Sequence, residues 1–317
     1  MNTEKFIEAA VRSAAPQLRL DAGETAGIVR ALLYIQSQTY DVMYPDLKFR
    51  QFIPITNEVN TGADSYAYRQ WDKFGKGKII TNYADDLPMA GAQVKEFINP
   101  VKSVGAAYQY SIQDLRRVNF DGLRLDLNLA MAARRMVEET LDNVAAFGDA
   151  SSGLTGFLNN GNVTIDAATG NWSGLTSTQI ITDLNKGATN IFSGTLETIA
   201  PDTIALPTSS YVYISQTPFT SAGGVVTDMT ILAWFKANNP WIKNVESWYQ
   251  LETAGAGSVK RMVTYKRDPM VLQAHVPQEF EQLPPEVRNL SFVVNCHART
   301  GGVAMHYPKG VRYMDGL

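Results

Sequence analysis

The sequence has few of the residues from which catalytic and metal sites are usually built. Its 317 residues include one cysteine, Cys296, and three histidines, His275, His297 and His306. One cysteine excludes a disulfide framework within the chain and fits a reducing compartment. No C-x-x-C, H-x₃-H or H-E-x-x-H pattern occurs, so the sequence predicts no metal site. We expect the histidines to be core or surface side chains with satisfied hydrogen bonds.

Patterns for nucleophilic catalysis and for phosphate binding are also missing. No G-x-S-x-G elbow occurs, and Cys296 stands in an apolar stretch where it is expected to pack as a small hydrophobe. The segments 75–78 and 255–257 fit neither the Walker nor the dinucleotide fingerprint and are interpreted as turns. The acidic pairs at 85–86 and 138–139 are interpreted as solvated side chains. The sequence therefore predicts no catalytic residue, no bound cofactor and no enzyme activity.

Long apolar runs and an excess of one charge are absent as well. No stretch approaches the ~18–20 apolar residues of a membrane span, and residues 1–20 lack the apolar core of a signal peptide. The formal net charge of −3, with a pI near 5.7, argues against a protein whose main task is to grip nucleic acid. An apolar fraction of 45% is enough for a substantial core. We expect a soluble, intracellular protein with no membrane partner.

The longest helical pattern runs from Asp121, a candidate N-cap, to the stop signal at Gly148. At about 1.5 Å per residue, the stretch from 123 to 147 makes a strut of roughly 37 Å. Apolar residues recur at three- and four-residue steps and define one face: Leu129, Ala133, Met136, Val137, Thr140, Leu141 and Val144. Polar residues are expected on the opposite face: Arg134, Arg135, Glu138, Glu139 and Asp142. Arg134 and Glu138 are spaced i,i+4, and so are Arg135 and Glu139.

Two further patterns precede this helix. Residues 1–45 carry two short amphipathic segments, 4–13 and 23–38, which form either an arm or the first helices of the main domain. Alternation over 49–55 predicts a strand. It opens a long two-stranded excursion, out from about residue 55 and back by about residue 94, whose aromatic side chains alternate with charges: Tyr66, Tyr68, Trp71 and Phe74. Because a lone hairpin cannot bury either face, these aromatics need another surface, within the chain or on a neighbouring subunit.

The remaining sequence predicts helices and strands without a regular βαβ repeat, which is typical of α+β proteins. The glycine-rich stretch 148–159 is expected to turn the chain. Expected helices cover 112–118, 179–192 and 227–236, and expected strands cover 97–111, 204–206, 242–251, 259–266, 271–275, 290–297 and 302–306.

Three segments near the C-terminus carry a family resemblance. Residues 265–272 read Y-K-R-D-P-M-V-L, residues 280–285 read F-E-Q-L-P-P, and Gly301-Gly302-Val303 is followed by Pro308, Tyr313, Asp315 and Gly316. Together with the order of arm, aromatic hairpin, long helix, G-L-T-G-F-L turn and mixed α/β region, they resemble a group of phage and prophage shell proteins. This group is similar to the tailed-phage major capsid proteins, whose Hong Kong phage capsid fold is shared with encapsulins and herpesvirus shells.

The resemblance implies an architecture of five segments. They are an N-terminal arm (1–48), an extended β-hairpin loop with its flanking strands (49–98), a peripheral domain with a long spine helix (99–150), an axial α/β domain (151–260), and tail strands that return to the peripheral domain (261–317).

The resemblance also implies a function. A major capsid protein self-assembles through hexamers and pentamers into an icosahedral shell around the double-stranded DNA genome of a tailed phage or prophage. Such a protein resides in the virion, is assembled in the host bacterial cytoplasm, and touches DNA weakly and non-specifically. Separate scaffolding, portal and decoration proteins are the implied partners.

Two alternatives stay open from the residues themselves: an encapsulin-like nanocompartment shell, and an α+β enzyme whose site is invisible in sequence. We expect the subunit interface to include eight residues: Tyr66, Tyr68, Trp71, Phe74, Arg134, Arg135, Glu138 and Glu139.

Overall fold

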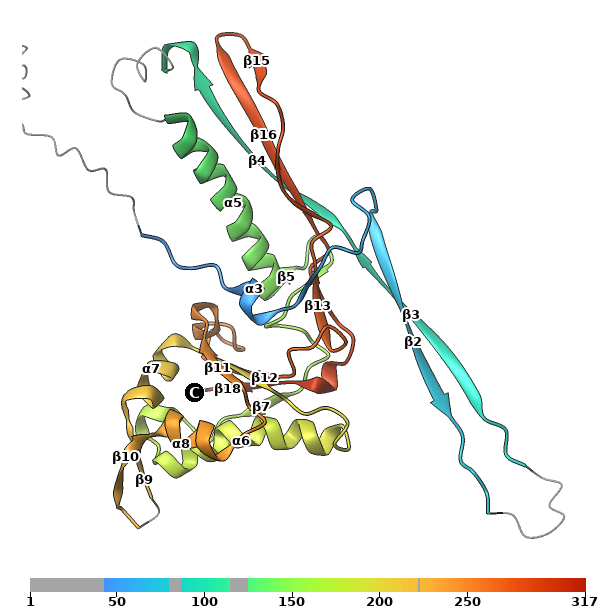
Figure 1. Ribbon diagram of the computed structural model, residues 1–317, viewed down its shortest axis with the longest axis vertical. Coiled ribbons are helices and arrows are strands. Elements are labelled where there is room, and N and C mark those ends of the chain that lie inside the picture. Colours follow the sequence, from blue (N-terminus) through green and yellow to red (C-terminus); the bar gives the residue numbers. More distant parts are fainter. Residues whose placement is uncertain (1–42, 80–86, 115–124, 222) are drawn as a thin grey trace, which may run out of the picture. The chain divides into compact units, whose positions relative to one another are not determined.

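The computed structural model describes residues 43–79, 87–114, 125–221 and 223–317 (Figure 1). The chain divides into two compact units, residues 1–46 and residues 47–317. Only the exposed, irregular segment 43–46 of the first unit is described, so the two helices expected within residues 1–45 lie outside the described residues. The candidate N-cap Asp121 and the acidic pair at 85–86 lie outside them too.

The second unit mixes helices and strands. In chain order its elements are α3 (Phe49–Phe52), β1 (Ile55–Thr56), β2 (Ser65–Phe74), β3 (Gly91–Pro100), β4 (Lys102–Ser111), α5 (Leu125–Phe147), β5 (Gly148–Asp149), β6 (Leu154–Thr155), β7 (Ile165–Ala167), η1 (Trp172–Gly174), α6 (Ser177–Gly194), β8 (Thr203–Leu206), α7 (Thr208–Gln216), β9 (Pro218–Thr220), β10 (Val226–Thr230), α8 (Ile231–Asn238), β11 (Asn244–Ser247), η2 (Tyr249–Glu252), β12 (Arg261–Tyr265), β13 (Leu272–His275), β14 (Gln278–Gln282), β15 (Glu286–Arg288), β16 (Ser291–Thr300), β17 (Val303–Met305), η3 (Pro308–Gly310) and β18 (Val311–Asp315). The predicted α+β class is confirmed.

Helix α5 is the predicted strut, but its buried face is turned from the one expected. Ala133, Val137, Leu141 and Ala145 form a buried stripe with a four-residue step. Met136, expected on the inner face, is 59% exposed. The apolar pattern was broad enough to fit two neighbouring faces, and the elements that pack on the helix select one of them.

Asp142 is the clearest correction on this helix, because it was expected on the solvated face and is completely buried. Its Oδ1 accepts a hydrogen bond from the Phe49 N–H at 3.0 Å, and its Oδ2 accepts one from Gln250 Nε2 at 2.5 Å. Burial raises the pKa of Asp142, while the backbone N–H groups of Phe49 and Lys48 oppose that rise. One carboxylate thus joins α5 to the start of α3 and to η2.

The chain turns sharply where α5 ends. Gly148 has a φ of +71°, a left-handed value that favours glycine. The chain then folds back, and the N–H groups of Phe157 and Leu158 donate to the carbonyls of Ala145 and Ala146 at 2.8 and 2.7 Å. A Cβ atom on Gly156 would lie 2.4 Å from the Gly148 nitrogen, so only glycine fits there. The predicted glycine-rich turn therefore caps the helix.

A four-stranded sheet packs on one side of α5 (Figure 1). Strand β4 runs antiparallel along the whole of β16, from the pair Ser291–Ser111 to the pair Thr300–Lys102. Strands β14 and β15 share the opposite edge of β16. Cys296 is buried there with Ala133 of α5, and burial raises the pKa of its thiol. It packs as the small hydrophobe that the sequence predicted.

A five-stranded mixed sheet, in the order β11-β8-β12-β18-β7, is covered on both faces. Ile204 and Met262 point into the core formed with α6 and α8. Val263 and Tyr265, on the other parity of β12, point into the core that contains Val137 and Leu141 of α5. Every residue of β8 and β12 is buried for this reason. One sheet thus separates two cores and belongs to both.

The segment 49–55 forms α3 and β1 and not the single strand that was predicted. Phe49, Phe52 and Ile53 are buried and Gln51 is exposed, a spacing that fits one turn of helix. Over so few residues the helical and strand periods cannot be told apart.

The hairpin is displaced along the chain relative to the expected limits of 55 and 94. Strand β1 pairs with β13, and the ribbon itself is β2 with β3. The expected strand 97–111 is broken at Val101, which is buried and whose N–H donates to the Asp64 carbonyl at 2.9 Å. The chain turns at this point from β3 into β4.

Two later boundaries also differ. Helix α8 begins only at Ile231, because the Thr230 side chain caps it and residues 226–230 pair with β9 as a strand. The expected strand 242–251 is divided into β11 and the 3₁₀ helix η2. The helix expected over 179–192 is confirmed as α6, whereas 112–118 is described, as helix, only at 112–114.

The division into five segments stays a prediction. The sheet topology adds that β12 and β18, which fall in its last segment, pair with β8 and β7 of the segment before it. Within the described ranges, no helix combines the length and apolar character that a membrane crossing requires.

We expect Asp142→Ala to lower the free energy of unfolding by about 2–4 kcal/mol, because the Phe49 N–H and the Gln250 amide lose their buried acceptor. Urea denaturation of the purified chain measures this change. Asp142→Asn is the matched control. Its amide keeps an acceptor for Phe49, and once the Gln250 amide turns over it donates to Gln250 Oε1, which has no partner within the described residues. An equal loss in both variants would contradict the assigned role.

Candidate assembly interface

The β2–β3 ribbon is a long element whose faces are mostly exposed among the described residues. Ten residue pairs join the strands, from Ser65–Pro100 to Phe74–Gly91. Because side chains alternate, Tyr66 and Tyr68 lie on one face with Phe74, while Trp71 lies on the other. The four aromatic residues predicted for the interface therefore divide between two faces.

The two tyrosines pack back onto the chain, at the root of the ribbon. The Tyr66 ring lies 4.0 Å from the His275 ring, centroid to centroid, and its hydroxyl accepts a hydrogen bond from Asn99 Nδ2 at 3.1 Å. The Tyr68 ring stacks on Phe97 at 5.1 Å and meets the edge of His306 at 4.5 Å. Burial raises the pKa of both phenols, so both are neutral near pH 7.

Gly301 makes the close approach at the root possible. A Cβ atom there would lie 2.7 Å from the Tyr66 ring and 3.2 Å from His275 Cβ. The next glycine, Gly302, has a φ of +68° and lies against the Thr155 backbone. The Gly-Gly-Val motif thus has a structural cause: it lets the ribbon root, β13 and β6 come together.

His275 corrects the expectation of satisfied histidines. It is 6% exposed, and neither ring nitrogen has a hydrogen-bond partner within the described residues. Burial lowers its pKa to about 4, with a smaller contribution from His306. No sequence signal indicates this, because only the tertiary fold brings β13 to β2.

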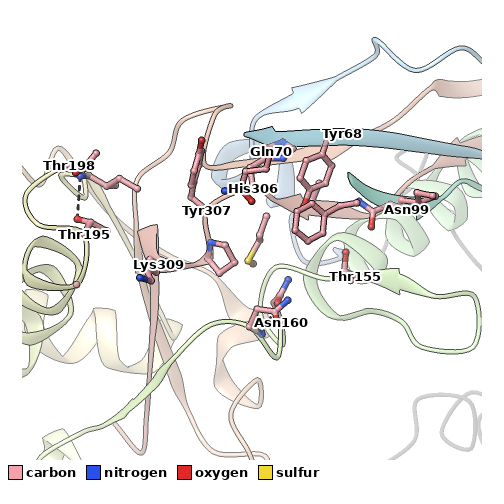
Figure 2. A pocket seen from close by; sticks show the side chains of 18 of the residues that line it. Tyr68, Gln70, Asn99, Thr155, Asn160, Thr195, Thr198, His306, Tyr307 and Lys309 are labelled. Atoms are coloured by element: carbon pink, nitrogen blue, oxygen red, sulfur yellow. Dashed lines mark hydrogen bonds between the residues drawn. The ribbon is translucent and has the colours of Figure 1, made fainter. Parts of the chain in front are cut away.

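A cavity of about 650 Å³ lies beside the root, between the ribbon, the C-terminal end of α6 and the β17–η3 segment (Figure 2). Tyr68, His306 and Asn99 line it from one side, and Thr195 and Thr198 from the other. Its polar groups are amides, hydroxyls, one imidazole and the Lys309 amine, and no carboxylate lines it within the described residues.

Beyond the root, the ribbon is exposed. Trp71 is 62% and Phe74 52% exposed. Trp71 faces its cross-strand partner Val94, and Ile98 continues the apolar stripe toward the root. Arg69 and Glu96 form an ion pair at 3.0 Å on the same face. Several large apolar side chains exposed on one short ribbon are typical of a surface that a partner covers.

The four charged residues predicted on α5 differ in how the chain uses them. Arg134 and Glu139 are exposed, and Arg135 and Glu138 are partly buried. Glu138 pairs with Arg50 of α3 at 3.3 Å, and no ion pair joins it to Arg134 within the described residues. Arg50 also binds Glu279 at 2.8 Å and thereby lowers the pKa of that carboxyl. Glu138 therefore makes a contact within the subunit, between α5 and α3.

Comparisons with solved structures show the same fold in particle-forming subunits. The capsid of Myoviridae phage XM1 matches with a TM-score of 0.80 at 17% identity, over 91% of this chain and 98% of that one. The capsid of a native GTA particle matches at 0.62 and 12%, over 94% and 99%. The virus-like particle from Pyrococcus furiosus matches at 0.55 and 12%, over 84% and 91%. A search of curated protein sequences found no match.

The fold is therefore that of capsid subunits, which build shells. The chain belongs to the major capsid protein family, whose model matches residues 75–317. The C-terminal motifs predicted membership of this family, and that prediction is confirmed. The shell-forming function that the family implies is confirmed with it.

We expect Trp71→Ala and Phe74→Ala, made singly, to leave the unfolding free energy of the subunit within about 1 kcal/mol, because both side chains are largely in water. Assembly should fail or slow in both variants, since each removes an aromatic anchor. Urea denaturation measures the first effect and sedimentation velocity the second. Tyr68→Ala is the matched control, because it removes contacts within the subunit and should lower stability. Normal shells from both ring variants would contradict the interface assignment.

Proposed function

We propose that this chain is the subunit of an icosahedral shell that encloses the double-stranded DNA genome of a tailed phage or prophage. The observation that carries the proposal is the match of the major capsid protein model to residues 75–317. The similarity to the XM1 capsid extends over 91% of the chain and supports it. Near-identical contacts, repeated around local rotation axes as pentamers and hexamers, would close such a shell.

The β2–β3 ribbon is the proposed contact with neighbouring subunits. Trp71 and Phe74 point to opposite sides of a two-stranded ribbon. A single flat partner covers only one of these rings, so we propose that the ribbon lies between two surfaces of the assembly. Arg134, Arg135, Glu138 and Glu139 remain proposed contacts of lesser weight, because Glu138 already pairs with Arg50.

We retain the five-segment architecture within this proposal. The segment 49–98 acts as the extended loop, and 99–150 as the peripheral domain with α5 as its spine. The five-stranded sheet, with α6 and α8 on one face, is the centre of the axial domain. Because β12 and β18 belong to that sheet, the axial domain draws strands from the last segment as well.

A structural role without enzyme activity is part of the proposal. The rival hypothesis of an α+β enzyme predicts a pocket with perturbed carboxylates. The cavity beside the ribbon root has no carboxylate within the described part of its lining. Family membership argues in the same direction.

The cargo and partners follow from charge and family. A net charge of −3 suits a shell that touches DNA weakly and non-specifically, because a strongly basic lining would hold the genome tightly. Separate scaffolding, portal and decoration proteins are the proposed partners. Assembly in the host bacterial cytoplasm and residence in the virion complete the proposal.

The encapsulin-like nanocompartment is less well supported. The family model is that of major capsid proteins.

Negative-stain electron microscopy with sedimentation of the expressed full chain tests the proposal. We expect closed particles, or sheets of rings, tens of nanometres across. DNA that is protected from nuclease in particles from infected or induced cells identifies a genome shell, and a copurifying enzyme identifies a nanocompartment. A chain that stays monomeric at high concentration, even when co-expressed with scaffolding and portal genes, would overturn self-assembly.

A further inference from the structure

The ribbon root is held to the rest of the chain by an unusual set of contacts. Two ring pairs, Tyr66–His275 and Tyr68–His306, join β2 to β13 and to the segment after β17. The Tyr66 hydroxyl adds one long hydrogen bond, at 3.4 Å, to the Gly301 carbonyl. Figure 2 shows Tyr68 and His306 against each other at the rim of the cavity. Two imidazoles therefore contribute ring contacts at the root, beside the Arg299–Asp64 ion pair and the hydrogen bond from the Val101 N–H to the Asp64 carbonyl.

Neither imidazole has an anionic partner. No hydrogen bond or ion pair of the described residues joins His275 or His306 to a carboxylate, and His306 adds to the lowering of the His275 pKa that burial causes. The titratable and charged groups of the surrounding elements are Tyr66 and Tyr68 of β2, Lys95 of β3 above Phe97, Arg299 of β16 paired with Asp64, and Lys309 of η3 in the cavity lining.

Protonation of His275 opposes the closed root on physical grounds. An imidazolium at 6% exposure gives up its hydration and finds no acceptor for either N–H. A cation–π contact with the Tyr66 ring offsets only part of that loss. When the ribbon swings away, the ring reaches water and regains its ordinary affinity for a proton. Acid therefore favours the released state.

We propose that the two tyrosine–histidine ring pairs form a proton-sensitive latch. Neutral imidazoles hold the root of the β2–β3 ribbon against β13 and β17, and their protonation in an acidic medium releases the ribbon. The latch acts within one chain and goes beyond the proposed shell function. Its failure would leave that function untouched.

The sign of the pH dependence follows from linkage. Burial depresses the pKa of His275 from 6.5 to about 4, so the latched state loses stability as the pH falls from 6.5 toward 4. A shift of this size raises the equilibrium constant for release by about 20-fold between pH 7 and pH 5. His306, whose pKa burial also lowers, adds to the effect in the same direction.

Hydrogen–deuterium exchange of the purified full chain at pH 7 and pH 5 tests the latch, with rates divided by the intrinsic rate at each pH. We expect the amides of residues 65–68 and 97–100 to lose about 20-fold in protection in the wild type. His275→Phe keeps a ring against Tyr66 and carries no proton, so most of the loss should disappear. The double variant His275→Phe, His306→Gln should remove the rest.

His297→Gln is the matched control. This third histidine lies on β16, 3.8 Å from Glu281 and partly exposed, and its loss should leave the wild-type response unchanged. Equal responses in H275F and wild type would overturn the latch, as would a wild type without any loss at pH 5. If H275F does not fold, NMR of the three histidines in wild type decides. Titration of His275 near 6.5, with root protection intact, would also overturn it.

Discussion

A two-stranded ribbon cannot bury its own faces, and much of this subunit depends on that constraint. Among the described residues, the chain covers the ribbon at its root, where Tyr66 and Tyr68 pack against His275 and His306. Farther out, Trp71 and Phe74 are left in water on opposite faces. The apolar surface that the monomer leaves open is the surface that an assembly has the greatest gain in covering. The proposal that the ribbon contacts neighbouring subunits rests on this incomplete burial.

The rest of the subunit is built to be rigid. The five-stranded sheet separates two cores and contributes side chains of alternate parity to both, so neither core can shift without the other. Asp142 links α5 to α3 and η2 through buried hydrogen bonds, and breaking them would leave polar groups without a partner away from water. Arg261 adds a buried pair with Asp315, at 2.6 Å, beside the Tyr313 ring. A tightly packed body that carries one exposed ribbon suits a subunit whose contacts repeat at slightly different angles.

The motifs behind the family resemblance also have physical causes. Asp268 accepts from the Met270 N–H at 2.9 Å and turns the chain from β12 into β13. Tyr265, at the start of the same motif, donates its hydroxyl to the Phe52 carbonyl at 2.7 Å. Gly301 admits the Tyr66 ring. These residues fix turns and close approaches, which explains how a family can be identified from them.

The α+β class, the strut helix with its glycine cap, helix α6 and the family can be predicted from the sequence, because each of them rests on local periodicity, turn chemistry or a contiguous motif. The remaining features depend on contacts between distant segments of the chain. Asp142 was expected to be solvated because the five polar residues of this helix look alike in the sequence. Only the packing of α3 and η2 against the helix distinguishes Asp142 from the other four. His275 was expected to be an ordinary histidine because β2, which buries its ring, lies some two hundred residues earlier in the chain. The placement of Trp71 opposite Phe74 follows from side-chain alternation, but only the structure shows that β2 runs unbroken from Ser65 to Phe74. Burial and pairing are properties of distant neighbours, and a local pattern does not contain them.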